Sequence, residues 1–532
     1  MSAPPEPAEV KWWRTGVIYQ VYPRSFADSN GDGVGDLDGI TSRLDYLSET
    51  LGVDAFWISP FYPSPQADFG YDVADYCDVD PMYGDLSAFD RLVAAAHLRN
   101  LAVIIDFVPN HCSDQHPWFV ESRSSLDNPK RNWFTWRPPQ PGGSRPNNWL
   151  SVFGGPAWTL DQTTGEYYLH SFLPEQPDLN WRNPEVESAM LAAVRFWLER
   201  GVDGFRIDVA HFIMKDPELR DQPPAESRRG LPHKPPSEYD TQEHLYDKGH
   251  PDVHQVFRKI RSVIDEYEPS SPRYSVGEIH EFDWVKWASY FGDDDELHMP
   301  FNFALLLTGL EASAIHDAIA DLEAVLPKGA WPNWVMGNHD EPRLATRLGR
   351  DQSRAAALLL LTLRGTPTIY YGDELGMPEA VIPQHMVKDP WGHRMPGFSR
   401  DGCRTPMQWN AGPNAGFSTA GETWLPVQPS SIINVESELA DPDSHLVLYR
   451  RLLSVRRAEP SLRAGNIALT EGLPPSCLGY TRHAPGSRPL TMLLNLSGEP
   501  VELAWSGQVL ASSVPGKPML GRLRAWEGLI LA

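Results

Sequence analysis

The sequence predicts an α/β protein built on a closed (β/α)8 TIM barrel, with a small domain inserted after the third strand and a C-terminal β-sandwich domain. Short apolar runs that end in polar clusters alternate with helical patterns, and parallel strands need such crossover connections. A long segment rich in Trp, Pro, Gly and Asn interrupts this alternation after the third run. Near the C-terminus the pattern changes to short alternating segments, which are typical of strands.

Eight apolar runs are expected to form the barrel. In chain order they are Val17–Val21, Ala55–Ile58, Ala102–Phe107, Gly204–Ile207, Tyr274–Val276, His298–Phe301, Trp334–Met336 and Thr368–Tyr371. Helical periodicity lies between most of them, at Leu86–Arg99, Val186–Glu199, Val253–Tyr267 and Ser353–Leu363. A last helix is expected at Ser444–Arg457, before strands at Leu490–Leu496 and Val501–Trp505.

The interruptions predict the domain boundaries. Residues 109–178 hold no long helical pattern and are expected to form the inserted irregular domain. The barrel domain then comprises residues 1–108 and 179–458, and residues 459–532 form the all-β domain. Two more long segments, 215–250 and 373–430, follow the fourth and eighth strands, where barrel enzymes build their sites.

Composition limits the partners and the compartment. The chain has 532 residues and a formal net charge of −24, which argues against nucleic acid or an anionic membrane surface as a partner. The N-terminus lacks the pattern of a signal peptide, and the longest apolar stretch, Ala355–Leu363, is too short to span a bilayer. The four cysteines have no metal-ligand spacing and are expected to be free thiols. We therefore expect a cytoplasmic enzyme with no organic cofactor, and the sequence leaves its oligomeric state open.

Acidic side chains stand where two predicted strands end. Asp208 follows the fourth strand and Glu278 follows the fifth, so both are expected at one mouth of the barrel. Most enzymes that cleave glycosidic bonds use a pair of Asp or Glu side chains that face each other across the bond. Taken singly, these residues also have structural interpretations: Arg206 beside Asp208 can be a simple ion pair, and Asn338–Asp340 a solvated turn.

Four segments in this order resemble the conserved motifs of the α-amylase superfamily of glycoside hydrolases, family 13. They are Asp106–His111, Gly204–His211, Gly277–Glu278 and Asn338–Asp340, supported by Gly16–Phe26 and Gly365–Glu374. The resemblance covers nearly the whole chain. It implies the same barrel, inserted domain and C-terminal β-sandwich that the alternation of elements predicts.

The resemblance also implies roles for three acids. Asp208 resembles the nucleophile, Glu278 the general acid/base, and Asp340 a third acid that binds sugar hydroxyls. Two displacements would retain the α configuration. Glu278 must start protonated, so we expect its pKa to be raised, while Arg206 is expected to keep Asp208 ionised.

Further residues resemble the exo-acting α-glucosidase and oligo-1,6-glucosidase branch. There an aspartate and an arginine, matched here by Asp68 and Arg404, close the pocket behind one terminal glucose, and a tyrosine matched by Tyr71 stacks under the ring. His111 and His339 resemble the imidazoles that bind hydroxyls of that sugar. The expected substrates are therefore short α-glucosides, namely malto- or isomalto-oligosaccharides or sucrose.

The linkage that is cleaved stays open. Gln176–Asn180 resembles the oligo-1,6-glucosidase version of a further motif, and valine at position 209 tends to accompany α-1,6 activity in that branch. A buried strand would also favour a β-branched residue there. Ala210-His211 departs from the usual pattern of Ile-Asn.

Other activities on the same scaffold are alternatives. A transglucosylase or isomerase, of the trehalose synthase or sucrose isomerase type, would keep water from the glucosyl intermediate. The segment Leu344–Leu348 lacks the charged loop of the sucrose isomerases. A catalytically dead scaffold protein is disfavoured by the three acids, and a metal-dependent hydrolase by the absence of HxH and HExxH spacings.

One loop is predicted to bind a structural Ca²⁺ ion. Oxygen-bearing side chains alternate at Asp28, Asn30, Asp32 and Asp36, with a backbone carbonyl expected from Val34. Gly39 stands where an EF-hand has its last acid, so the loop is not a true EF-hand. A Gly/Asp turn without an ion is the alternative, but three neighbouring carboxylates and the family resemblance favour the metal.

Overall fold

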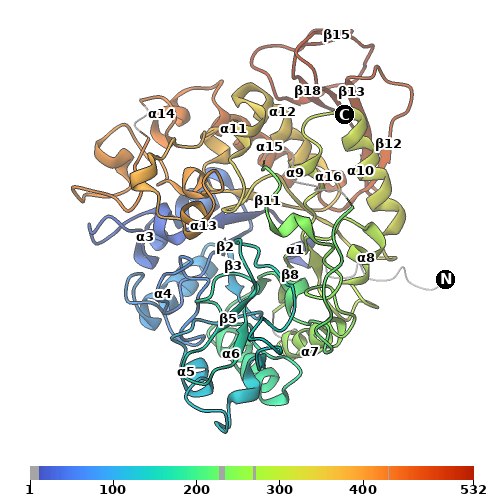
Figure 1. The fold of residues 1–532 in the computed structure, drawn as a ribbon. Helices are drawn as coiled ribbons and strands as arrows, with labels where there is room; N and C mark the ends of the chain where they lie inside the picture. The colour runs from blue at the N-terminus through green and yellow to red at the C-terminus, as the bar shows by residue number, and fades with distance from the viewer. Residues whose placement is uncertain (1–10, 227–233, 268–270, 429–430) are drawn as a thin grey trace, which may run out of the picture.

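Eight parallel strands form one sheet around the centre of the molecule (Figure 1). The computed structural model describes residues 11–226, 234–267, 271–428 and 431–532. The strands lie in the order β10-β11-β1-β2-β3-β7-β8-β9, and every pairing in this order is parallel. Their bounds are β1 Ile18–Val21, β2 Ala55–Ile58, β3 Ala102–Phe107, β7 Gly204–Ile207, β8 Tyr274–Gly277, β9 Met299–Pro300, β10 Asn333–Val335 and β11 Thr366–Tyr370. The predicted (β/α)8 barrel is confirmed, with each predicted run on its strand.

Helices surround this sheet because each has one apolar face. The longer ones are α4 Leu86–His97, α6 Pro184–Glu199, α7 Val253–Asp265, α10 Ala312–Val325, α12 Arg350–Thr362 and α15 His445–Ala458. The shorter ones are α1 Trp12–Thr15, α2 Pro23–Phe26, α3 Leu37–Ser42, α5 Pro117–Ser122, α8 Trp284–Ser289, α9 Ala304–Leu307, α11 Leu344–Leu348, α13 Pro390–Arg394, α14 Val435–Ala440 and α16 Pro460–Ala464. None of the described helices is both long and apolar enough to cross a bilayer.

Local signals set the helix ends. The Asp85 side chain accepts a hydrogen bond from the amide of Ala88 at the start of α4. Asn183 caps α6 in the same way, and Pro184 occupies its first turn, where no amide donor is needed. The apolar run of α12 is buried on all sides, because α15 and the C-terminal sheet cover the face that points away from the barrel.

The inserted segment between β3 and α6 contains a three-stranded antiparallel sheet in the order β4-β6-β5. These strands are β4 Trp136–Arg137, β5 Trp158–Leu160 and β6 Tyr167–Leu169. A bridge between His111 and Asp178 joins the two ends of the insertion just above β3. The insertion therefore begins and ends beside the polar residues that follow the third barrel strand.

The C-terminal region is β-structured from residue 466 onward, as the sequence predicted, although helix α16 occupies the start of the predicted range 459–532. Five strands lie in the order β12-β13-β14-β18-β16, and β15 pairs with β17. Their bounds are β12 Asn466–Leu469, β13 Cys477–His483, β14 Leu490–Asn495, β15 Val501–Glu502, β16 Val509–Ser512, β17 Arg522–Leu523 and β18 Gly528–Leu531. The strand expected at Val501–Trp505 is shorter than predicted. This sheet packs on α10 and α12, at the upper right of Figure 1. The four cysteines, all in described parts of the chain, are free.

We expect replacement of Gly204 by alanine to destabilise the barrel where β7 meets β8. Gly204 pairs with Tyr274, and a Cβ atom on Gly204 would lie 2.8 Å from the carbonyl oxygen of Tyr274 and 2.9 Å from its Cβ. Because backbone cannot yield as a side chain does, Gly204→Ala should lower the free energy of unfolding by about 1–3 kcal/mol. Urea unfolding measures this. Gly421→Ala is the control, since nothing lies within 4 Å of the added methyl group. Equal stability of the two variants would contradict this account of β7.

Candidate active site

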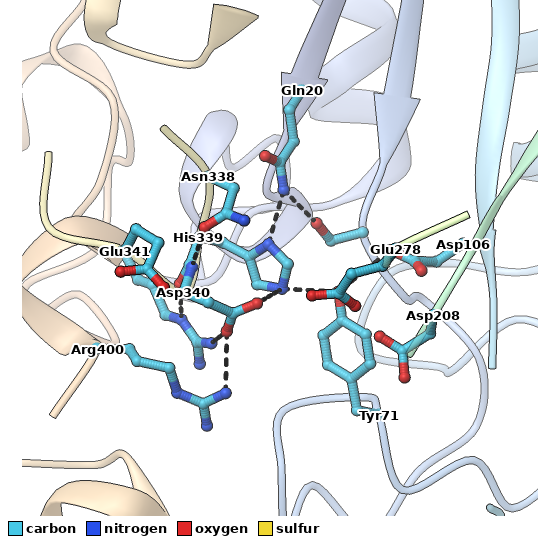
Figure 2. A network of polar contacts seen from close by, with 12 residues as sticks. Gln20, Tyr71, Asp106, Asp208, Glu278, Asn338, His339, Asp340, Glu341 and Arg400 are labelled. Atoms are coloured by element: carbon cyan, nitrogen blue, oxygen red, sulfur yellow. Dashed lines mark hydrogen bonds and ion pairs between the residues drawn. The ribbon is translucent and has the colours of Figure 1, made fainter. Parts of the chain in front are cut away.

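One arginine holds three carboxylates at the carboxyl ends of the central strands. Nη1 of Arg206 donates to Oδ1 of Asp106 at 2.7 Å and to Oδ1 of Asp208 at 2.6 Å, and Nη2 donates to Oε2 of Glu278 at 2.6 Å. The register explains this meeting: Asp106 on β3 is paired with Arg206 on β7, and β8 ends one residue before Glu278. Residues 206 and 208 share one face because side chains alternate along an extended segment. Figure 2 shows Asp208 and Glu278 beside Tyr71.

The backbone turns sharply directly after Asp208. Val209 adopts a left-handed conformation with φ 33° and ψ 46°, which is unfavourable for a β-branched residue by about 1–3 kcal/mol. This turn brings the Val209 amide to Oε2 of Glu278 at 3.1 Å and the Ala210 amide to the Glu278 carbonyl at 3.0 Å. The interpretation of residue 209 as an ordinary buried-strand position is therefore wrong. The strain serves to fix Glu278 against Asp208.

The pKa values of the acid pair run opposite to the expectation. Burial raises the pKa of Asp208 well above its ordinary value, and Arg206 offsets this only in part. Burial also opposes ionisation of Glu278, but the charge of Arg206 and the hydrogen bond from His280 outweigh it and lower the Glu278 pKa. The reason is the number of donors: Glu278 accepts from Arg206, Val209 and His280, whereas Asp208 has one contact with Arg206.

Asp340, after β10, is held by two arginines. Its Oδ1 accepts from Nη1 of Arg400 at 3.0 Å and from Nη2 of Arg404 at 2.8 Å, and its Oδ2 lies 3.2 Å from Nε2 of His339 (Figure 2). Burial would raise the pKa of Asp340, but contact with His339 and the charges of the two arginines lower it well below its ordinary value. Asp340 is thus an ionised carboxylate in the same cavity as Asp208 and Glu278.

The expected pairing of Asp68 with Arg404 is wrong. Oδ1 of Asp68 accepts from Nη2 of Arg400 at 2.6 Å, and Asp389 holds the same guanidinium at 2.7 Å. Arg404 lies behind Asp340, donates to the carbonyl oxygen of His339 at 2.7 Å, and does not line the cavity. Both arginines belong to one short segment around a 3₁₀ turn, and Arg400, which sequence reasoning did not single out, is the one that reaches Asp68.

His339 supports Tyr71 rather than lining the cavity. Nδ1 of His339 lies 2.8 Å from Nε2 of Gln20, which can only donate, so the ring proton is on Nε2. That nitrogen faces the Tyr71 hydroxyl at 2.7 Å, and the two rings lie parallel with centroids 5.4 Å apart. Burial lowers the pKa of His339 to about 3. The ring is therefore neutral and holds Tyr71, which lines the cavity as predicted.

His111 lies in the cavity close to Asp68. Nε2 of Gln176 reaches both His111 Nε2 at 3.2 Å and Asp68 Oδ2 at 3.3 Å. Burial lowers the pKa of His111 to about 4, so this imidazole is also neutral. These three side chains and Arg400 lie together in one part of the cavity lining.

The cavity has a volume of about 250 Å³ and an aromatic wall that sequence reasoning missed. Its lining side chains from the inserted segment and the long loops after β7 and β11 are Phe153, Phe172, Phe212, Lys234, Tyr239, Lys248 and Trp391. Abundant aromatic residues in those segments were the signal available, but nothing in the sequence tells a lining ring from a core ring.

The loop predicted to bind Ca²⁺ is held by its own hydrogen bonds. Asp28, Asn30 and Asp32 each accept from the backbone amide two residues later, at 3.1, 2.9 and 2.8 Å, and Asp36 caps α3 by accepting from Gly39. In the described residues, no three Asp, Glu, His or Cys side chains form a group that could hold a metal ion. The donor set thus falls short of the three carboxylates that the sequence suggested, and the Ca²⁺ site stays a prediction.

A (β/α)8 barrel with paired carboxylates on one arginine, and a third acid in the same cavity, defines a class of enzymes that cleave glycosidic bonds. The model of the alpha-amylase catalytic domain matches residues 20–465. The chain belongs to the α-amylase family of glycoside hydrolases.

Relatives of similar length support a narrower branch. The chain is 45% identical over 500 residues to "Probable alpha-glucosidase" of Rhizobium meliloti (strain 1021), covering 92% of this chain and 90% of that protein. It is 38% identical over 526 residues to the oligo-1,6-glucosidase of Parageobacillus thermoglucosidasius, covering 91% and 90%. This confirms the predicted α-glucosidase and oligo-1,6-glucosidase branch.

Solved structures with the same fold include enzymes of other activity. The alpha-glucosyl transfer enzyme XgtA superposes with a TM-score of 0.92 at 42% identity, covering 98% of this chain and 100% of that one. The trehalulose synthase MutB from Pseudomonas mesoacidophila MX-45 superposes with a TM-score of 0.88 at 33% identity, with the same coverage. Glycoside hydrolysis and glucosyl transfer are thus both represented among close neighbours.

We expect Asp106 to make stability depend on pH. Burial raises its pKa to about 6, although Arg206 opposes this, whereas an unfolded aspartate has a pKa of about 3.9. The folded state thus keeps this proton to higher pH, and the resulting stabilisation is lost as the pH rises from about 4 through 6. Asp106→Asn should remove this contribution, so its free energy of unfolding should fall less steeply over that range.

Urea unfolding at several pH values measures the two slopes. Asp127→Asn, at an exposed position outside the cavity, should keep the wild-type slope. An Asp106→Asn slope equal to that of the wild type would contradict the buried, protonated state of Asp106.

Proposed function

We propose that the protein is a retaining α-glucosidase that releases α-glucose from the non-reducing end of short α-glucosides. One observation carries this proposal: Asp208 and Glu278 bind adjacent nitrogens of one guanidinium in a cavity that the Asp68–Arg400 ion pair also lines. We infer that this ion pair closes one end of the cavity. A closed end fits one terminal glucose, whereas an endo-acting enzyme needs an open groove. The alpha-glucosidase and oligo-1,6-glucosidase names of the relatives support the same branch.

The spacing of the carboxyl groups favours retention. Retaining enzymes hold their two carboxyl groups about 5–5.5 Å apart, and inverting enzymes about 6.5–9.5 Å, to leave room for a water molecule. Asp208 and Glu278 each lie 2.6 Å from a terminal nitrogen of the same guanidinium, and such a shared small partner is compatible with the shorter, retaining separation. The geometry therefore suits direct attack by one of the carboxylates.

In the proposed reaction, the Asp208 carboxylate attacks the anomeric carbon while Glu278 protonates the departing glycosidic oxygen. A water molecule, deprotonated by Glu278, then cleaves the glucosyl ester and restores the α configuration. Glu278 can carry its proton only after its contact with Arg206 weakens, since that contact lowers its pKa. The positive charge of Arg206 would then stabilise the ionised form of Asp208, which the attack requires.

Glucosyl transfer is the second candidate activity. XgtA and MutB share the fold over nearly the whole chain, and their titles name a glucosyl transfer enzyme and a trehalulose synthase. The product profile on maltose, isomaltose, sucrose and trehalose separates the candidates. Free glucose from the start supports hydrolysis, whereas new disaccharides with little glucose would support transfer or isomerisation. The same profile decides between α-1,4 and α-1,6 preference.

The two proposed catalytic acids can be tested directly. Asp208→Ala and Glu278→Gln should each lower kcat on an aryl α-glucoside by at least about 10³-fold, because each removes a group that covalent catalysis requires. Thermal unfolding and circular dichroism check that the variants fold. Asp127→Asn, the exposed control, should keep the wild-type rate. Turnover near that of the wild type in either variant would refute the assigned role, and NMR of the first-formed glucose anomer tests retention.

We also propose that the 28–36 loop binds Ca²⁺ as a structural ion, with oxygen ligands from Asp28, Asn30, Asp32, Val34 and Asp36. EDTA should then lower the melting temperature by a few degrees, and added Ca²⁺ should restore it, because a ligand that binds only the folded state stabilises it. Asp28→Asn is the matched variant and should respond less to EDTA. A wild-type melting curve that EDTA leaves unchanged would refute the metal site.

A further inference from the structure

Two polar groups at one end of the cavity lack hydrogen-bond partners in the described chain. They are Nε2 of His211, which is buried, and Nζ of Lys248, which lies over two aromatic rings, and both side chains line the cavity. Both come from the long segment that follows β7. The proposed reaction does not use either of them.

Contacts connect these two side chains to Glu278 through His280. Nε2 of His280 lies 3.0 Å from Oε1 of Glu278, and the His280 ring centroid lies 6.1 Å from that of His211. The His211 ring lies 4.8 Å from that of Phe212, and Nζ of Lys248 lies 5.4 Å above the Phe212 ring. Since Glu278 protonates the leaving oxygen, groups reached beyond it face the aglycone.

His211 presents a hydrogen-bond acceptor to the cavity. Its Nδ1 lies 3.3 Å from the Glu278 carbonyl oxygen, which can only accept, so Nδ1 carries the proton. Burial, with help from Lys248 and His280, lowers the pKa of His211 well below its ordinary value, so the ring is neutral. Nε2 is therefore an unprotonated acceptor, buried and without a partner in the described part of the chain. A ligand must supply a donor to it.

Lys248 presents an ammonium group that no described carboxylate contacts directly, although the more distant charges of Asp247, Glu281 and Asp240 act on it. Its ammonium group lies over the rings of Phe212 and Tyr239, at 5.4 and 5.2 Å, and makes no hydrogen bond or ion pair within the described residues. The neighbouring carboxylate of Asp247 is bound by Nδ1 of His244 at 2.6 Å instead. Lys234 also lines the cavity, but its ammonium group forms an ion pair with Glu341 at 3.0 Å, whereas that of Lys248 does not contact a carboxylate of the described residues.

We propose that this end of the cavity binds an aglycone carrying a carboxylate and a hydroxyl group, so that α-glucosides of hydroxy acids are preferred substrates. The carboxylate would accept from the Lys248 ammonium group, and the hydroxyl would donate to Nε2 of His211. A neutral sugar would leave the lysine ammonium group without a direct ion pair, and hydrogen bonds between two charged groups are the stronger ones. This inference rests on the proposed α-glucosidase function.

The test uses two aryl α-glucosides of equal size, 4-carboxyphenyl and 4-carbamoylphenyl, which differ in charge. We expect wild-type kcat/KM to be about tenfold higher for the carboxylate, with the ratio falling as NaCl is added. Lys248→Met should bring the ratio close to one, and Lys248→Arg should keep it. Lys286→Met, at an exposed position on α8, should leave the wild-type ratio unchanged.

The ratio of the two kcat/KM values decides between the possible conclusions. A wild-type ratio near or below one overturns the inference, even if Lys248→Met does not fold. A ratio that Lys248→Met leaves intact overturns the role of Lys248. If the wild type cleaves the carbamoyl compound without a charge preference, only this inference fails and the proposed function stands. If it cleaves neither compound, both fail.

Discussion

The arrangement of the cavity depends on the guanidinium of Arg206. It is 1% exposed and contacts three buried carboxylates through two of its nitrogens. A buried carboxylate without a partner costs several kcal/mol, so these acids can share one barrel mouth only because a five-donor fork reaches all of them. One positive charge cannot neutralise three negative ones. Raised pKa values for Asp106 and Asp208 reflect this deficit of positive charge. In the proposed reaction a proton must reach Glu278, whose own pKa is lowered by the same guanidinium.

The barrel builds the cavity from two sides. Neighbouring strands β3, β7 and β8 deliver Asp106, Arg206 and Glu278 in register, which requires only parallel pairing. On the other side, segments after β10 and β11 bring Asp340 and Arg400 together although they are sixty residues apart. The inserted segment and the long loop after β7 then cover the acids with aromatic side chains. The residues that follow the strands thus form the cluster of acids, and the loops form the cavity wall that limits access to it.

Sequence reasoning succeeded where a residue type and a strand end were sufficient. The eight strands and the meeting of Asp208, Glu278 and Asp340 follow from apolar runs that end in acids. It failed where side-chain direction decides. Arg400 rather than Arg404 reaches Asp68, because one 3₁₀ turn separates them. Likewise, the low pKa of Glu278 depends on three donors that only the fold assembles, one of them presented by the left-handed Val209.

If the protein is the α-glucosidase proposed above, the Asp68–Arg400 pair also dictates the order of events in a catalytic cycle. A sugar held against that ion pair cannot leave through it, so the aglycone must depart first and the glucose last, by one route. Whatever enters the vacated space meets the glucosyl ester next, whether it is water or another hydroxyl compound. At high substrate concentration a second substrate molecule competes with water for that space, so the ratio of hydrolysis to transfer becomes a property of concentration as well as of sequence.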